Sequence, residues 1–120
     1  MEKENFKVGD VLDINKAVYG CREYDIQEIF KVIKRSGYIW MSWGMRSPVI
    51  EVKDKSLRFR VNGHHHKGTV HIVLDFMDTF TIYYTTLIKN QIVKIREGVY
   101  IEDLIDILDT DIERISAYRR

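Results

Sequence analysis

The chain is poor in cysteine, in proline and in long apolar runs, and each scarcity excludes a class of protein. Cys21 is the one cysteine among 120 residues, so neither an internal disulfide framework nor a four-cysteine zinc site can form. A single proline and 45% hydrophobic residues indicate one packed domain over residues 1–120 rather than a disordered chain. No stretch approaches the roughly 18 consecutive apolar residues that a membrane span needs. The charged segment Met1–Asn5 does not have the pattern of a signal peptide, so we expect a cytoplasmic location.

The chain also lacks the short motifs that mark common catalytic and cofactor sites. It contains no phosphate-binding glycine loop, no H-E-x-x-H or G-x-S-x-G motif and no calcium loop. Cys21 follows Gly20, and no histidine lies nearby in the sequence to activate its thiol. His71 and Asp75 share one face of a predicted strand, but they would be ~13 Å apart at ~3.3 Å per residue, too far for an acid–base pair. We therefore expect no enzymatic activity and no cofactor.

Three segments carry the capping or the spacing of helices. A short helix is predicted within 10–19, with Asp10 as its cap. A second, over about 25–36, begins with the capping box Asp25–Glu28 and ends at Gly37. Its apolar residues recur at helical spacing: Ile26, Ile29, Phe30 and Ile33. The last helix has a longer apolar stripe: Ile101, Leu104, Ile105, Leu108, Ile112 and Ile115.

Between the last two helices the hydrophobic period changes to two, which is typical of strands. Strands are predicted over 38–43, 49–52 (with Pro48 at its start), 56–61, 68–76, 80–84 and 92–96. In 56–61, the apolar residues take one face and Arg58 and Arg60 take the other. The fold class is therefore α+β. It has an antiparallel sheet of about four to five strands, flanked by an N-terminal helical region and a C-terminal amphipathic helix, with the helices covering one face.

The alternation also predicts which residues of 68–76 and 80–84 pair across the sheet. Phe76 is expected to face Phe80 across a three-residue loop, because cross-strand partners must share a face. This register places His71 opposite Thr85. The face that carries these two residues is polar, and we expect it to be solvated.

Charge is strongly segregated along the chain although the net charge is only +1. Residues 31–67 hold nine basic and two acidic side chains, a net of +7, whereas 68–113 hold three basic and nine acidic, a net of −6. Such a dipolar distribution favours an anionic partner on one side, although solvated faces of ordinary helices and strands would also produce it. The aromatic and basic side chains of this segment together predict a binding site for nucleic acid or another anionic partner. The predicted residues are Lys31, Lys34, Arg35, Trp40, Trp43, Arg58 and Arg60.

The acidic face of the last helix has no internal compensation. No lysine or arginine occurs between Ile101 and Glu113, so no ion pairs at i,i+4 spacing relieve the repulsion among its carboxylates. This helix is therefore predicted to face positive charge, either outside the molecule or inside it, where the basic residues of 31–67 are a candidate source.

Four histidines raise the question of a metal site. In an extended segment His64 and His66 project to the same side, and His71 would join them only if the loop folded back. Neighbouring carboxylates are absent from this stretch, and three adjacent histidines cannot all reach one ion. The run 62–68 therefore indicates a polar turn with adventitious metal binding rather than a physiological metal site.

Part of the chain resembles small hypothetical proteins of bacteria and their phages. The resemblance lies in Phe59–Gly63, Val70–Leu74, Thr81–Tyr84 and Gly98–Leu104, within the run from Phe59 to Ile112. These are packing positions of hairpins and of a helix, so the resemblance implies no activity and supplies no functional residue. It favours an origin in a phage or another mobile element.

These observations together predict a small, non-enzymatic protein-binding module. Its contact would be with an unknown protein partner or with a second copy, and no membrane association is expected. The alternative is a nucleic-acid-binding protein that uses the basic aromatic segment 31–67.

Overall fold

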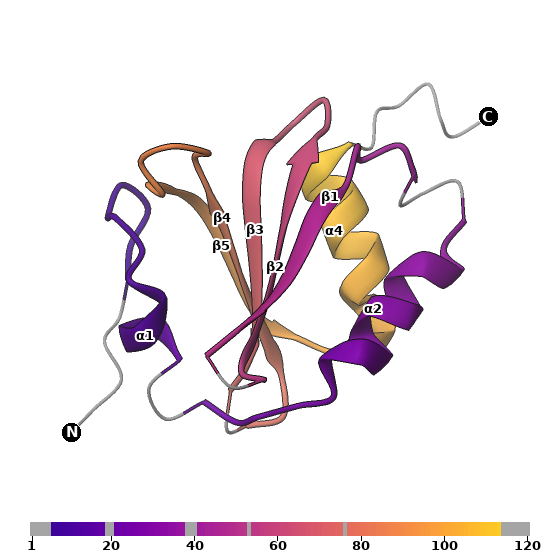
Figure 1. The fold of residues 1–120 in the computed structure, drawn as a ribbon, viewed down its shortest axis with the longest axis horizontal. Helices are drawn as coiled ribbons and strands as arrows, with labels where there is room; N and C mark the ends of the chain where they lie inside the picture. The colour runs from indigo at the N-terminus through magenta and orange to yellow at the C-terminus, as the bar shows by residue number, and fades with distance from the viewer. Residues whose placement is uncertain (1–5, 19–20, 38–40, 53, 76, 114–120) are drawn as a thin grey trace.

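The computed structural model describes residues 6–18, 21–37, 41–52, 54–75 and 77–113. Its strands form one antiparallel sheet in which sheet order follows chain order, β1-β2-β3-β4-β5. The strands are β1 (Arg46–Glu51), β2 (Ser56–Asn62), β3 (Lys67–Leu74), β4 (Phe80–Thr85) and β5 (Ile92–Val99). The helices are α1 (Ile14–Ala17), α2 (Ile26–Arg35), the 3₁₀ turn η1 (Ile101–Asp103) and α4 (Leu104–Ile112) (Figure 1). The predicted α+β class with an antiparallel sheet is therefore confirmed, and no described helix is long and apolar enough to cross a membrane.

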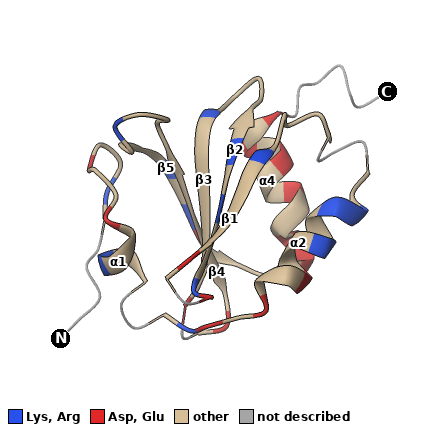
Figure 2. Ribbon diagram, in the orientation of Figure 1, with Lys and Arg blue, Asp and Glu red and all other residues tan. Residues whose placement is uncertain are grey.

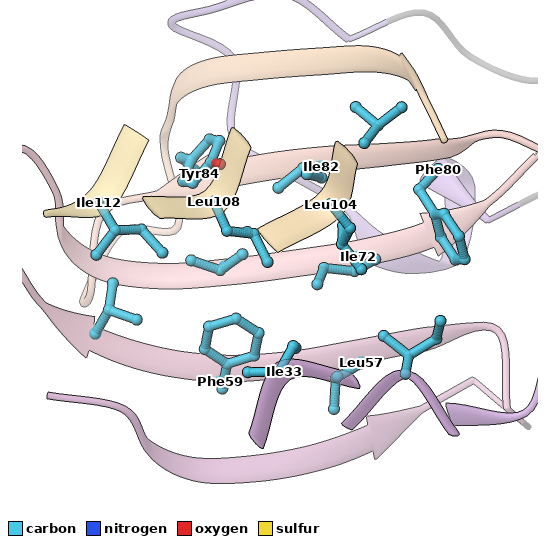
Figure 3. Packing of buried hydrophobic residues seen from close by; sticks show 14 of the residues in the cluster. Ile33, Leu57, Phe59, Ile72, Phe80, Ile82, Tyr84, Leu104, Leu108 and Ile112 are labelled. Carbon is cyan, nitrogen blue, oxygen red and sulfur yellow. The ribbon is translucent and has the colours of Figure 1, made fainter. Parts of the chain in front are cut away.

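The main core lies between one face of the sheet and the helices α2 and α4. Alternate residues of β2, β3 and β4 point into it, and Ile33 of α2 lies beside Phe59 of β2 (Figure 3). Leu104, Leu108 and Ile112 of α4 complete the layer, and all three are fully buried. Burial of this many large apolar side chains is the main stabilising contribution to the fold.

The second face of the sheet is covered in part by the N-terminal segment. Leu12, Ala17 and Val18 pack with Val73 and Tyr83 in a separate buried cluster. Figure 1 shows α1 on this side of the sheet, opposite α2 and α4. The prediction that helices cover only one face is therefore incomplete.

The polar part of the second face is also buried where we expected solvent. His71 is 2% exposed and Thr85 is 0% exposed. The physical reason is that the polar groups of this face contact one another: His71 hydrogen-bonds Glu51 at 3.2 Å and lies 3.4 Å from the hydroxyl of Thr85. The N-terminal segment lies on the same side of the sheet, where Leu12 exchanges backbone and side-chain hydrogen bonds with Asn90 at 2.9 Å.

The predicted α2 is confirmed, and α1 is shorter than predicted. Asp25 caps α2 by accepting a hydrogen bond from the amide of Glu28 at 3.1 Å. For α1 the cap is Asp13, not Asp10, because the Asp13 carboxylate accepts from the first-turn amides while Asp10 accepts from the amide of Lys7.

Two predictions around β1 are wrong. Met41 is helical, and Ser42 and Trp43 lie in a turn, so none of these three residues of the predicted strand 38–43 is in a strand. Residues 38–40 lie outside the described residues. Pro48 lies inside β1 and not at its start. A register shift between Arg46 and Val49 places Pro48 in an irregular part of an edge strand, where its missing amide is tolerated.

The predicted pairing of β3 with β4 is shifted by two residues. Leu74, and not Phe76, faces Phe80, so Tyr83 lies opposite His71. The loop is longer than predicted because the carboxylate of Asp75 organises it, accepting a hydrogen bond from the amide of Met77 at 2.8 Å. Phe76 itself lies outside the described residues.

Positive charge does face the acidic helix, and it comes from β5. The carboxylate of Asp111 is almost fully buried and accepts hydrogen bonds from Lys94 at 3.0 Å and from Arg96 at 2.6 and 2.8 Å. Asp109 accepts from the indole of Trp43 at 3.0 Å, and Glu113 pairs with a histidine of the β2–β3 turn. Asp111 therefore takes its cations from β5 and not from the lysines and arginines of 31–67, although Trp43 and His64 of that segment do contact the helix.

The hydrogen bonds of Asp111 lower its pKa below the ordinary value. Burial alone would raise that pKa, but the hydrogen bonds from Arg96 and Lys94 more than offset burial. Asp111 is therefore ionised near neutral pH and links β5 to α4.

Replacing this carboxylate by an amide is expected to destabilise the fold. Asp111→Asn keeps the size of the side chain but removes the charge that Lys94 and Arg96 contact, which should cost about 1.5–3 kcal/mol of unfolding free energy. Urea unfolding of Asp111→Asn and of the control Glu102→Gln, which removes an exposed charge from η1, measures the difference. Equal stabilities of the two variants would contradict the role assigned to Asp111.

Candidate functional site

The second face of the sheet carries a continuous group of polar side chains on β2, β3 and β4. Because Leu57, Phe59 and Val61 must point into the core, strand alternation directs Arg58 and Arg60 to the opposite face. Arg60 lies opposite Thr69 and Arg58 lies opposite His71, so the same face continues on β3.

A buried histidine and a carboxylate from the edge strand form the centre of this face. Nδ1 of His71 donates to Oε1 of Glu51 at 3.2 Å, and Nη1 of Arg58 lies 3.2 Å from Oε2 of the same carboxylate. The Ser56 hydroxyl donates to Glu51 at 3.3 Å. On its other side, Nε2 of His71 lies 3.4 Å from the hydroxyl oxygen of Thr85. Both ring nitrogens of His71 are therefore engaged within the protein.

These contacts keep Glu51 ionised. Burial by itself would raise the pKa of Glu51, but the hydrogen bond from His71 and the charges of His71 and Arg58 outweigh burial. The pKa of Glu51 therefore lies below its ordinary value of 4.5. The ionised carboxylate connects β1 to β2 and β3 and fixes the orientation of His71.

A cavity of about 530 Å³ lies above this centre. Its floor includes Arg58, Arg60 and His71, and the N-terminal segment 11–14 forms one wall. Leu87 and Asn90, from the connection between β4 and β5, also line it. The hydrogen bonds between Asn90 and Leu12 hold two of these walls together.

A second cavity, of about 240 Å³, adjoins the first because Arg60 and Leu87 line both. Arg46 and Lys67 also line it. We call the two adjoining cavities, with Arg46, Arg58, Arg60 and Lys67, the cationic groove.

The charge of the cationic groove is not balanced within it. Its two acidic lining residues already have partners: Glu51 contacts His71 and Arg58, and Asp13 caps α1. Arg46 and Arg60 lie directly opposite each other on β1 and β2, and both are exposed. In the part of the chain that the structure describes, no carboxylate forms an ion pair with either of them.

The structure divides the predicted anion-binding residues between two sides of the molecule. Arg58 and Arg60 lie in the cationic groove, whereas Lys31, Lys34 and Arg35 lie on the exposed side of α2, which covers the opposite face (Figure 2). Trp43 is fully buried, so its ring is not accessible to a ligand. Trp40 lies outside the described residues. The predicted site is therefore not one continuous patch.

Arg46, Lys67 and Glu51 line the groove but were not among the predicted site residues. Arg46 and Lys67 belong to the same basic segment, but nothing in the local pattern pairs them with Arg60. Glu51 lies 20 residues from His71, and only the order of the strands brings them together.

The histidines named as metal ligands do not gather at one place. His64 forms an ion pair with Glu113, and His66 is buried, with Nε2 3.1 Å from the carbonyl of Thr69 and its ring against Tyr84. Burial lowers the pKa of His66. His71 projects from the other face of the sheet. Among residues 6–18, 21–37, 41–52, 54–75 and 77–113, no group of three or more histidine, cysteine or acidic side chains is arranged to hold a metal ion.

The stability that Glu51 contributes is expected to depend on pH. Because its pKa is lower in the folded state, the contribution is complete above pH 4.5 and is lost as the pH falls through the folded-state pKa. Near neutral pH, Glu51→Gln should therefore lower the unfolding free energy by about 1.5–3 kcal/mol. Denaturant unfolding at several pH values should show that this difference shrinks in acid.

The matched control for this experiment is Asp54→Asn, in the turn after β1. Asp54 is exposed and has a left-handed backbone, φ +68°, which asparagine tolerates. A loss of stability in Glu51→Gln that stayed constant down to the acid limit would contradict the assignment of an ionised Glu51.

Comparison of the chain with protein-family models, with curated proteins and with solved structures found no match. The cationic groove is the feature of the described structure that bears most directly on function. Its two main features are the arginines that face each other across β1 and β2 and the apolar side chains beside them.

Proposed function

We propose that the protein is a non-enzymatic binding module that receives an acidic segment of a partner protein in the cationic groove. The observation that carries this proposal is the direct opposition of Arg46 and Arg60. Like charges directly opposite each other across strands are destabilising. An anionic group placed between the two guanidinium groups would remove that repulsion and form charge-assisted hydrogen bonds with both.

The groove also offers apolar contacts beside its cations. Val11 and Leu87 line it and are 64% and 53% exposed, and Ile88 next to Leu87 is 91% exposed. A partner segment that carries both carboxylates and an apolar side chain would use both kinds of surface. Exposed apolar residues beside a charged site are common features of protein interfaces.

Nucleic acid is the alternative partner. Binding of single strands depends on aromatic rings on which bases stack, and no phenylalanine, tyrosine or tryptophan lines the described cationic groove. An acidic protein segment is therefore the better fit to these residues. The phage or mobile-element origin suggested by the sequence stays a prediction.

The proposed role needs no catalysis. Both nitrogens of His71 are occupied by Glu51 and Thr85, which fits a structural role for the histidine. The function therefore depends on Arg46 and Arg60, not on the histidine.

A short fluorescein-labelled peptide that is rich in glutamate and contains one leucine tests the proposal. We expect saturable binding, measured by fluorescence anisotropy, that weakens as salt is added. Arg46→Gln with Arg60→Gln should weaken it by about tenfold or more, because charge-assisted contacts to the peptide are lost. The matched control, Lys31→Gln with Lys34→Gln, removes the same charge from α2 and should bind like the wild type.

Three other results would contradict the proposal. They are no saturable binding, equal losses in both double variants, and tighter binding of a thymidine oligonucleotide of matched charge than of the peptide. Sedimentation of the protein alone tests self-association, in which the exposed acids of η1 and α4 in a second copy (Glu102, Asp103 and Asp106) would occupy the groove. Thermal unfolding of each variant establishes that it remains folded.

A further inference from the structure

We infer that the smaller cavity of the cationic groove is a binding site for a phosphate monoester, carried on a serine, threonine or tyrosine of the partner segment. This inference rests on the proposed function and specifies the chemical group that the groove selects. The observation that supports this inference is the position of three basic residues on adjacent strands: Arg46, Arg60 and Lys67 line one cavity of about 240 Å³.

The three cations lie on the same face of the sheet. Arg46 faces Arg60, and Arg60 faces Thr69. Lys67 precedes Thr69 by two residues on β3, so strand alternation gives it the same side. The side chains from β1, β2 and β3 therefore converge on the cavity that all three line.

The charge balance differs between the two cavities. The larger one includes the carboxylates of Glu51 and Asp13 in its lining, whereas the lining of the smaller one contains no acidic residue. Glu113 is near Lys67 in an adjacent cavity, but Glu113 is buried and paired with His64. The smaller cavity therefore concentrates positive charge without an anion of its own.

A phosphate monoester matches this charge better than a carboxylate does. It carries about −1.5 to −2 charges near neutral pH and three strong acceptor oxygens, whereas a carboxylate carries one charge. Two guanidinium groups facing each other can each form paired hydrogen bonds with phosphate oxygens, and the ammonium group of Lys67 adds a third donor group. A phosphodiester of nucleic acid has only one charge and fewer free oxygens, so it fits the three cations less well.

Three labelled peptides of otherwise identical sequence test the inference, with serine, glutamate or phosphoserine at one position. At slightly alkaline pH we expect the phosphoserine peptide to bind about tenfold or more tightly than the glutamate peptide, and the serine peptide to bind weakest. The advantage of phosphoserine should shrink as the pH falls through about 6, where the phosphate takes up its second proton. Arg60→Gln should abolish most of this advantage, and Lys31→Gln with Lys34→Gln should preserve it.

The outcomes separate this inference from the proposed function. Equal affinity for the glutamate and phosphoserine peptides would overturn the inference of a phosphate-binding site and leave the acidic-segment proposal intact. No binding of any peptide would overturn both. Inorganic phosphate that binds as tightly as the phosphopeptide would show that the cavity binds the free phosphate ion. A thymidine oligonucleotide that binds more tightly than the phosphopeptide would show that the ligand is nucleic acid. Either result would overturn the inference.

Discussion

Burial of one face of the sheet under α2 and α4 is the constraint on which the rest of the structure depends. Leu57 and Phe59 of β2 must point into the core, and a strand cannot bury one set of side chains without turning the alternate set to the other side. Arg58 and Arg60 are that alternate set. The same hydrophobic packing that stabilises the domain therefore places two arginines on the second face.

The second face is organised by a smaller number of specific contacts. Glu51 connects the edge strand to β2 and β3 through Arg58 and His71, and the hydrogen bonds between Leu12 and Asn90 bring the N-terminal segment over the sheet. These contacts leave the charges of Arg46 and Arg60 unbalanced within the described residues. The result is a domain in which two like charges lie opposite each other on one exposed surface of the sheet.

Elements specified by neighbouring residues could be predicted from the sequence. The Asp25 cap and the apolar spacing after it fix α2, and the alternation in 56–61 fixes β2 and the direction of Arg58 and Arg60. The predicted charge segregation is also visible, but its basic residues divide between α2 and the groove (Figure 2). A count of charges along the chain contains no information on which side of a sheet each charge lies.

Features that depend on register or on distant pairing could not be predicted. The irregular pairing around Pro48 determines that Arg46 faces Arg60, and no local pattern reveals it. The side-chain hydrogen bond of Asp75 to the loop amide shifts the β3–β4 register by two residues. The contact of Glu51 with His71 joins residues on different strands, so it follows only from the assembled sheet.

Arg46 and Arg60 are expected to repel each other in the free protein. A double-mutant cycle with Arg46→Gln and Arg60→Gln, measured by urea unfolding at low salt, tests it most directly. We expect an unfavourable coupling of about 0.2–1 kcal/mol between the two arginines, which disappears in high salt. A coupling that is zero or favourable at low salt would show that the two arginines do not repel each other. An anion bound between them would then relieve no repulsion, and the proposed function would lose its main support.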